Sequence, residues 1–220
     1  MRPPPTMRRA IYLTSPVLRQ GTESLPMITF RMVADTIDYQ ECDTLMFTSK
    51  QAVASAETID PHWKTYPTIA IGAATAAQIE RLGGTVLYHP KRFYGETLAQ
   101  EVLERFRSRR ILYLRPRVVS FDSRAFLAQA GYTLREQILY ETVCRTYSAD
   151  AAPPPGAIVV FTSPSTIHCF LKRFAWRDDY TAIVIGEATR KHLPSECDYR
   201  VAPYPLIDAC LETARQIANA

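Results

Sequence analysis

Two turns in the sequence combine a glycine with a threonine three residues later, a spacing suited to holding an anion. Each turn follows an apolar run and opens a helical pattern, so we expect a strand, a tight turn and a helix start. The first backbone N–H groups of a helix have no partner within it and carry partial positive charge, which favours a carboxylate or phosphate. Simple helix capping is the alternative. The residues are Gly72, Ala73 and Thr75 in the first turn, and Gly186 and Thr189 in the second.

Hydroxyl groups and cations gather after other predicted strands. Serine and threonine hydroxyls at such positions cap a helix or bind a ligand carboxylate, and the sequence leaves both roles open. Lys50 and Arg115 stand just past strand ends, where we expect them to pair with ligand carboxylates unless they are simply solvated. The hydroxyl-bearing residues are Thr48, Ser49, Thr162, Ser163 and Ser165.

These features belong to an internal repeat. Phe47-Thr48-Ser49 matches Phe161-Thr162-Ser163 at an offset of 114 residues (161 − 47 = 114). The two glycine–threonine turns are separated by the same offset. A shared offset across both pairs of turns indicates two similar structural units.

Short β-branched runs alternate with helical patterns, which is typical of an α/β fold with parallel sheets. The second unit lacks a counterpart to 111–131, and the strand predicted at 11–13 is the obvious substitute. We therefore expect one domain to be inserted in the other, with two linker strands acting as a hinge beside a ligand cleft. The boundaries are 1–36 with 147–220 for the discontinuous domain, 40–142 for the inserted domain, and 28–39 and 137–146 for the linker strands.

The composition narrows the function classes. The 220 residues are 47% hydrophobic and carry a net charge of +4, a mild excess that suits an acidic small molecule and is too weak and scattered for nucleic acid. No stretch approaches the ~20 apolar residues of a membrane span, and the apolar run after the basic start is too short for a secretory signal. We expect a cytoplasmic protein with no membrane partner, whose native start is Met1 or Met7.

The supply of metal ligands is poor. The four histidines and five cysteines are widely spaced, with no C-x-x-C or H-x-x-x-H pattern, so we expect no metal site. We also expect no disulfide framework, and reduced thiols packed as small hydrophobic groups. The sequence contains neither G-x-G-x-x-G nor G-K-[ST], which disfavours a dinucleotide-dependent oxidoreductase and a P-loop. The cysteines are Cys42, Cys144, Cys169, Cys197 and Cys210.

Seven segments together resemble the uroporphyrinogen-III synthase family. In chain order they are TSKQAV, AIGAATA, LYLRP, LYET, FTSPS, VIGEAT and ACLETA. The resemblance implies two flavodoxin-like domains joined by a two-stranded β-linker. It implies a cofactor-independent lyase of heme biosynthesis, which cyclises linear hydroxymethylbilane to uroporphyrinogen III with loss of water and inversion of ring D. We expect this small molecule to be the partner of a monomer.

The resemblance also implies roles for individual residues. Tyr140, in Leu-Tyr-Glu-Thr, is expected to donate a proton to the departing hydroxyl, while Thr75 and Thr189 orient substrate or water. Arg190 departs from the small residue that the family has at its position. A competing hypothesis is a non-enzymatic, hinged two-domain protein that binds a small polyanion, although receptors of that kind are mostly exported. The expected substrate-binding residues are Thr48, Ser49, Lys50, Gly72, Ala73, Arg115, Thr162, Ser163, Ser165, Gly186 and Thr189.

Overall fold

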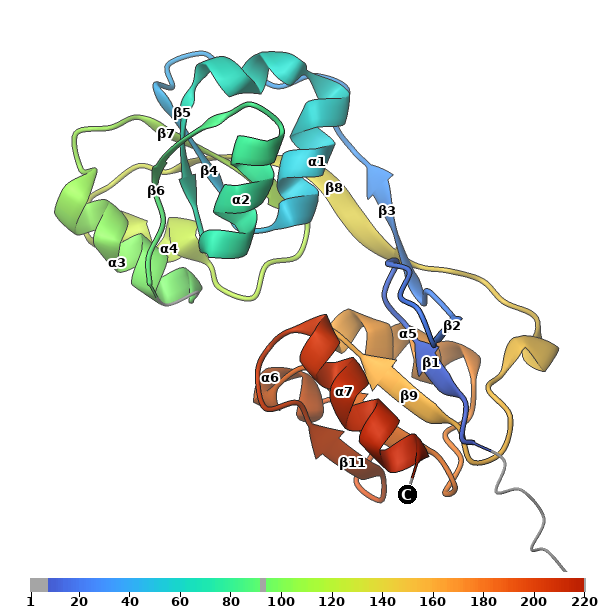
Figure 1. Ribbon diagram of the computed structural model, residues 1–220. Coiled ribbons are helices and arrows are strands. Elements are labelled where there is room, and N and C mark those ends of the chain that lie inside the picture. The colour runs from blue at the N-terminus through green and yellow to red at the C-terminus, as the bar shows by residue number, and fades with distance from the viewer. Residues whose placement is uncertain (1–7, 92–93, 220) are drawn as a thin grey trace, which may run out of the picture. The chain divides into compact units, whose positions relative to one another are not determined.

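The computed structural model describes residues 8–91 and 94–219 (Figure 1). The chain divides into two compact units. Unit 1 consists of residues 1–29 and 143–220, and unit 2 of residues 30–142. These boundaries fall within the two stretches that the sequence analysis assigns to linker strands. The choice between Met1 and Met7 as the native start lies outside the described residues.

Unit 2 is built on a six-stranded sheet with the order β3-β8-β7-β4-β5-β6. The pairs from β8 across to β6 are all parallel. A parallel sheet places the carboxyl ends of its strands along one edge. The strands are β3 (Ile28–Met32), β4 (Thr44–Phe47), β5 (Pro67–Ala70), β6 (Thr85–Tyr88), β7 (Ile111–Pro116) and β8 (Arg135–Cys144).

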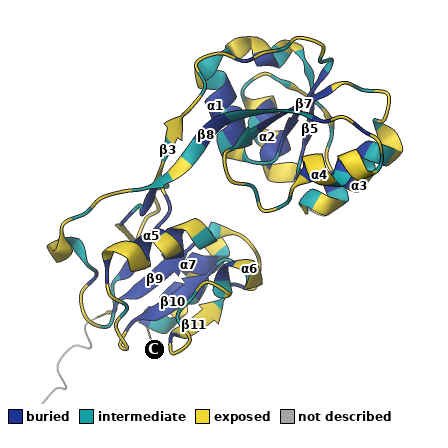
Figure 2. Cartoon of the chain, turned by 180° about the vertical axis from the view of Figure 1, so that it is seen from behind, coloured by how far each residue is buried: buried dark blue, intermediate teal, exposed yellow. Residues whose placement is uncertain are grey.

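Two pairs of helices cover the faces of this sheet. Successive residues of a strand point to opposite faces, so Phe47 packs with one pair of helices and Met46 with the other. α1 (Lys50–Ile59) and α2 (Ala73–Arg81) pack on the first face through residues such as Val53 and Ile79. α3 (Gly95–Arg105) and α4 (Ser123–Gln129) pack on the second through Leu98 and Leu127. Figure 2 shows the buried strands between helices whose outer sides are exposed.

Unit 1 has a five-stranded parallel sheet with the order β11-β10-β9-β1-β2. α7 (Ile207–Ala218) packs through Cys210 and Leu211 on one face. α5 (Pro164–Arg173) contributes Phe170, whose ring meets that of Phe161 edge-on. The strands are β1 (Ile11–Leu13), β2 (Glu23–Ser24), β9 (Ile158–Phe161), β10 (Thr181–Val184) and β11 (Asp198–Val201). The mixed α/β class with parallel sheets is therefore confirmed.

The sequence repeat is reproduced in the structure residue by residue. The bounds of β4, β5 and α1 become those of β9, β10 and α5 on adding 114. Ser49 and Ser163 cap their helices with nearly the same backbone angles, φ −159° and φ −165°. Gly72 and Gly186 both have φ 176°, an extended conformation open to any residue. The two repeats differ in length at the next helix, because α6 (Glu187–Arg190) has four residues whereas its counterpart α2 has nine.

The chain passes between the units within β3 and β8, which are neighbours in the sheet. The N–H of Val33 donates to the Leu139 carbonyl, and the N–H of Arg145 donates to the Met27 carbonyl, both at 2.9 Å. Met27 precedes Val33 in the first segment, whereas the partner of Met27, Arg145, follows the partner of Val33, Leu139, in the second. The two segments therefore run in opposite directions. The linker strand predicted over 28–39 ends earlier, at Met32.

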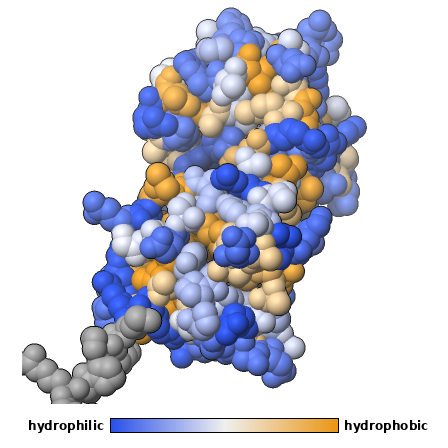
Figure 3. Space-filling view, turned by 90° about the vertical axis from the view of Figure 1, so that its right-hand side faces the viewer, coloured by the Kyte–Doolittle hydropathy of each residue, from blue (hydrophilic) through white to orange (hydrophobic). Residues whose placement is uncertain are grey.

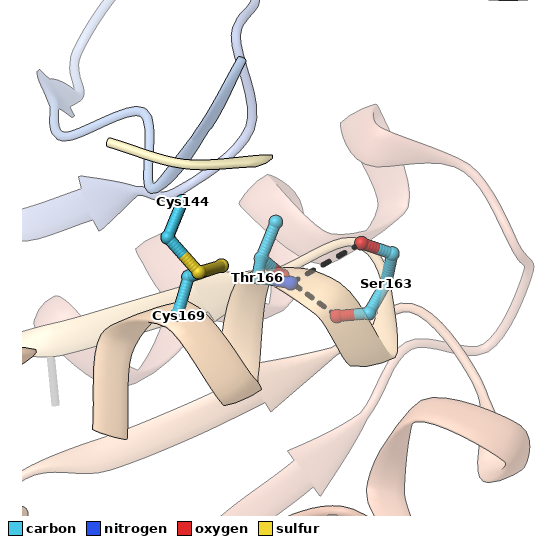
Figure 4. The surroundings of a disulfide bond; sticks show 4 residues. All are labelled: Cys144, Ser163, Thr166 and Cys169. Atoms are coloured by element: carbon cyan, nitrogen blue, oxygen red, sulfur yellow. Dashed lines mark hydrogen bonds between the residues drawn. A yellow bond between two sulfur atoms is a disulfide. The ribbon is translucent and has the colours of Figure 1, made fainter. Parts of the chain in front are cut away.

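The expectation of reduced cysteines is wrong for two of the five. Cys144, the last residue of β8, forms a disulfide with Cys169 of α5 (Figure 4). The two Cα atoms are 5.2 Å apart, although 25 residues separate them in sequence. The two cysteines meet because the end of β8 lies beside α5. The spacing of the cysteines along the sequence does not predict this pairing. Cys42, Cys197 and Cys210 are free thiols, and burial raises the pKa of Cys197 and of Cys210 to about 11.

None of the described helices has the length and apolar character needed to cross a membrane. Hydrophilic side chains cover much of the face drawn in Figure 3, with smaller hydrophobic areas between them. This distribution fits helices that bury one side and leave the other in water.

Candidate active site

The carboxyl edge of the unit 2 sheet collects most of the residues that the sequence singles out. β4 ends before Thr48 and Ser49, β5 ends before Gly72, and β7 ends at Pro116. Because β5 and β7 both pair in parallel with β4, these three strand ends lie next to one another. The hydroxyl-rich turn after β4 is therefore central to this edge.

Ser49 joins a helix cap to the predicted proton donor. Its Oγ accepts the N–H of Ala52 at 3.0 Å, which caps α1, and lies 3.0 Å from the hydroxyl oxygen of Tyr140. The Tyr140 ring is 4% exposed, and Phe30 of β3 packs edge-on against it with ring centres 5.5 Å apart. Burial raises the pKa of Tyr140, and the Ser49 hydrogen bond offsets part of that rise. The phenol is thus held in place and kept protonated.

A second tyrosine, Tyr113 of β7, makes an equivalent contact on the other face of the sheet. Its hydroxyl lies 2.6 Å from Thr48 Oγ1, and the side chain is 2% exposed. Burial raises the pKa of Tyr113 to about 12, although the Thr48 hydrogen bond and the nearby Arg115 charge both lower it. Tyr113 is not among the predicted site residues, because a tyrosine inside an apolar strand is typical of a core position.

A pocket of about 160 Å³ opens beside this second pair. Thr48, Ser49 and Tyr113 contribute to its lining, together with the loop that follows β7. That loop supplies Val118 and Ser120, and α4 supplies the buried Ser123. The pocket therefore combines hydroxyl groups with aliphatic walls and holds several water-sized groups.

The start of α2 stands beside these turns. Thr75 is buried and its N–H donates to the Gly72 carbonyl at 3.0 Å, while Ala73 is exposed. The N–H groups of the two residues before Thr75 in this turn, Ala73 and Ala74, have no acceptor within the helix, so this helix start fits the predicted anion contact. Its substrate role stays a prediction.

The cationic side chains near the carboxyl edge of the sheet differ in how closely they interact with other residues of the protein. Lys50 is exposed on the first residue of α1. Arg115 is mostly buried, with Nε 3.3 Å from a Glu136 carboxylate oxygen, and it donates to the carbonyls of Pro116 and Arg117. Its guanidinium thus orders the loop after β7, and a contact of Arg115 with the substrate stays a prediction.

Two further arginines, which are not among the predicted site residues, pair with Glu141, the next residue after Tyr140 in β8. Arg31 of β3 and Arg117 both pair with Glu141, the latter at 2.7 Å. These two ion pairs lower the pKa of the Glu141 carboxyl. Both guanidinium groups remain half exposed or more, so they are available to a ligand carboxylate. Strand pairing brings the two arginines to the same carboxylate. Because 86 residues separate them in the sequence (117 − 31 = 86), the sequence does not predict this proximity.

The remaining predicted residues belong to unit 1. Ser163 caps α5 by accepting the Thr166 N–H at 3.4 Å (Figure 4), and Thr189 is buried in α6. Arg190 pairs with Glu187 at 2.6 Å, so the departure from the family pattern is used within its own helix. Thr162 and Gly186 are half-buried beside strand ends, and Ser165 is exposed in the first turn of α5.

Comparison with known proteins identifies the fold family. Residues 13–212 match the family model described as Uroporphyrinogen-III synthase HemD. A uroporphyrinogen-III synthetase from Helicobacter pylori superposes with a TM-score of 0.80 at 23% identity, covering 95% of this chain and 99% of that one. A mutant uroporphyrinogen III synthase from the extremely thermophilic bacterium Thermus thermophilus gives a TM-score of 0.58 at 12% identity, covering 96% and 98%.

At these identities the two solved structures show a shared fold alone, and the sequence matches no curated protein. The family model spans most of the chain, from β1 to α7. It confirms the resemblance carried by the seven segments. This chain belongs to the uroporphyrinogen-III synthase family, whose members are cyclising lyases of tetrapyrrole biosynthesis.

Proposed function

We propose that this chain closes hydroxymethylbilane to uroporphyrinogen III with Tyr140 as the proton donor. The observation that carries the residue assignment is the contact between Tyr140 and Ser49. Ser49 Oγ already accepts the Ala52 N–H, and its own proton needs an acceptor. If the Ser49 hydroxyl donates its proton to the Tyr140 oxygen, the proton of the Tyr140 phenol remains free to be donated to the substrate.

The chemistry then needs one mobile proton and firm positioning. Protonation of the ring A hydroxyl by Tyr140 releases water and leaves an azafulvene. The substituted position of ring D attacks it, and the resulting spiro intermediate fragments and recloses with ring D inverted. A proton lost from the closing ring returns to the phenolate, so only water is released overall. Since unassisted closure gives the uninverted isomer, most of the catalytic work is holding and shielding the chain.

The binding roles in this proposal fall on hydroxyls, helix starts and cations. Hydroxyl and N–H donors suit a polycarboxylate without large net charge. Thr75 and Thr189 orient substrate or water, and Arg31 and Arg117 add positive charge around Glu141 for a substrate carboxylate. The other proposed substrate-binding residues are Thr48, Ser49, Lys50, Gly72, Ala73, Arg115, Thr162, Ser163, Ser165 and Gly186.

The strand orders support a flavodoxin-like description of both units. Unit 1 reads 2-1-3-4-5 when its own strands are numbered along the chain, which is the flavodoxin order. Unit 2 gives the same order if counting starts at β7 and β8 and continues with β4, so it is a circular permutation of unit 1 with β3 added at the edge. Cytoplasmic location and a monomeric state belong to the same proposal, and light scattering tests the latter.

The test supplies hydroxymethylbilane in situ, oxidises the products and separates the type I and type III isomers by chromatography. The wild-type chain is expected to give type III. Tyr140→Phe should lose at least about tenfold in kcat, the lower range for a positioned proton donor, with a smaller change in KM. Only type I product from the wild type would support a non-enzymatic binding protein instead, and near-normal kcat in Tyr140→Phe would remove the assignment of the donor.

A further inference from the structure

The pocket beside Tyr113 is the strongest feature that the proton chemistry does not use. It lies on the face covered by α3 and α4, whereas Tyr140 packs on the face covered by α1 and α2. All of its lining residues come from unit 2. Its lining includes the hydrogen-bonded pair Tyr113 and Thr48 together with the aliphatic Val118 and Val119.

The internal repeat shows that the fold does not require the Tyr113 hydroxyl. In unit 2, Ile111 lies opposite Thr44, and in unit 1, Ile11 lies opposite Ile158. Thr44 and Ile158 are equivalent at the repeat offset (158 − 44 = 114). Two residues further on, the counterpart of Tyr113 is therefore Leu13, which is fully buried.

Leu13 thus occupies this position in unit 1, where Thr162 is the counterpart of Thr48. Burying a phenol instead of an aliphatic group costs free energy unless the hydroxyl is hydrogen-bonded. Thr48 satisfies one hydrogen bond of Tyr113, and a phenolic oxygen can both donate and accept. Because Tyr113 is part of the pocket lining, a ligand in the pocket can use the second capacity.

We propose that Tyr113 and Thr48 form the floor of a subsite for one carboxylate-bearing side chain of the tetrapyrrole. This inference rests on the proposed function and makes Tyr113 a positioning residue, separate from the proton donor. An acetate or propionate group has one or two methylenes ending in a carboxylate. The methylenes match Val118 and Val119, and the carboxylate accepts hydrogen bonds from Tyr113 and from the serines of the lining, Ser120 and Ser123.

The charge around the pocket supports an anion bound largely by neutral donors. Arg115 lies near enough to Tyr113 to influence its ionisation, and Glu136 neutralises much of that guanidinium. A carboxylate in the pocket would therefore be bound by hydroxyl groups and not by a full positive charge. Hydrogen bonds to a charged group are stronger than neutral ones, which compensates for the missing ion pair.

The test compares Tyr113→Phe with a matched control, Tyr132→Phe. Tyr132 is also a buried tyrosine of unit 2, but its hydroxyl donates to the Arg109 carbonyl at 2.8 Å, before the amino end of β7. In the coupled assay, Tyr113→Phe is expected to raise KM for hydroxymethylbilane about tenfold or more, as for a lost hydrogen bond to a charged group. The fall in kcat should be smaller, and Tyr132→Phe should leave KM unchanged.

A binding measurement provides a readout that does not depend on turnover. Uroporphyrin III, the oxidised product, and coproporphyrin III, in which methyl groups replace the acetates, are titrated against the wild type, Tyr113→Phe and Thr48→Val. We expect both variants to weaken uroporphyrin III binding about tenfold. Loss for uroporphyrin alone identifies an acetate in the subsite, and loss for both porphyrins identifies a propionate.

The outcomes separate this inference from the function on which it rests. A wild-type chain that makes only type I isomer overturns the proposed function. If the wild type makes type III while Tyr113→Phe and Thr48→Val keep normal KM and porphyrin affinity, the subsite is overturned and the function stands. Thr48→Val retains the side-chain volume, so a folding defect in one variant leaves the other as a test.

Discussion

Ser49 and Ser163 occupy the same position in the two repeats, yet only Ser49 touches a tyrosine hydroxyl. We expect Ser49→Ala and Ser163→Ala each to lower the free energy of unfolding by about 1 kcal/mol, since each removes a helix N-cap. Only Ser49→Ala should also lower kcat, because it removes the group that orients Tyr140. Urea unfolding and the isomer-resolved assay measure the two effects, and an equal loss of kcat in both variants would contradict the assignment.

The pKa of Tyr113 predicts a change in stability at alkaline pH. Burial raises this pKa to about 12, above the ordinary value near 10. A raised folded-state pKa means that the stabilisation is complete below about pH 10 and is lost as the pH rises through about 12.

Comparison with Tyr113→Phe isolates this contribution. Between about pH 9 and about pH 11.5, the wild type should lose about 2 kcal/mol more than Tyr113→Phe. Denaturant unfolding at the two pH values measures the difference. An unchanged difference would mean that the phenol titrates normally in the folded protein.

At the scale of elements, the disulfide links β8 to α5 and closes a short loop within unit 1. For a separation of 25 residues, the loss of chain entropy in the unfolded state corresponds to about 3 kcal/mol. Reduction, or Cys144→Ala, should lower the stability of unit 1 by that order. Thermal unfolding with and without a reductant measures it, with Cys144→Ala as the control. A reductant should have no further effect on that variant.

The elements that the sequence predicted well are those with unambiguous patterns. β9, with the sequence Ile-Val-Val-Phe, is buried on both faces and reads as a continuous apolar run. β2 has two exposed residues, Glu23 and Ser24, and carries no pattern to recognise. Helix α6 ends early because Pro194 follows closely and cannot continue a helix.

The site was predicted less completely than the fold, for a physical reason. Tyr140 and the turn residues stand in recognisable segments, so the turns could be expected at strand ends and Tyr140 within a linker strand. Tyr113, Arg31 and Arg117 gain their roles from cross-strand neighbours, which depend on strand order. The pairing of Cys144 likewise depends on which helix lies beside the end of β8.

At the scale of the whole molecule, unit 2 has its own sheet and two core layers. We expect residues 30–142 expressed alone to fold, because both faces of the sheet are covered by helices of the same segment. Cooperative thermal unfolding and a dispersed NMR spectrum are the expected results. An unfolded fragment would show that its stability depends on the rest of the chain.

The pairing of β1 with β9 has a consequence for how the protein is made. Ile11 lies opposite Ile158, so β1 can pair with β9 only after the whole of unit 2 has been synthesised. At roughly 5–20 residues per second, that delay is on the order of ten seconds. During this interval unit 2 has time to fold, while the edge of β1 that later pairs with β9 stays open and can be bound by nascent-chain chaperones.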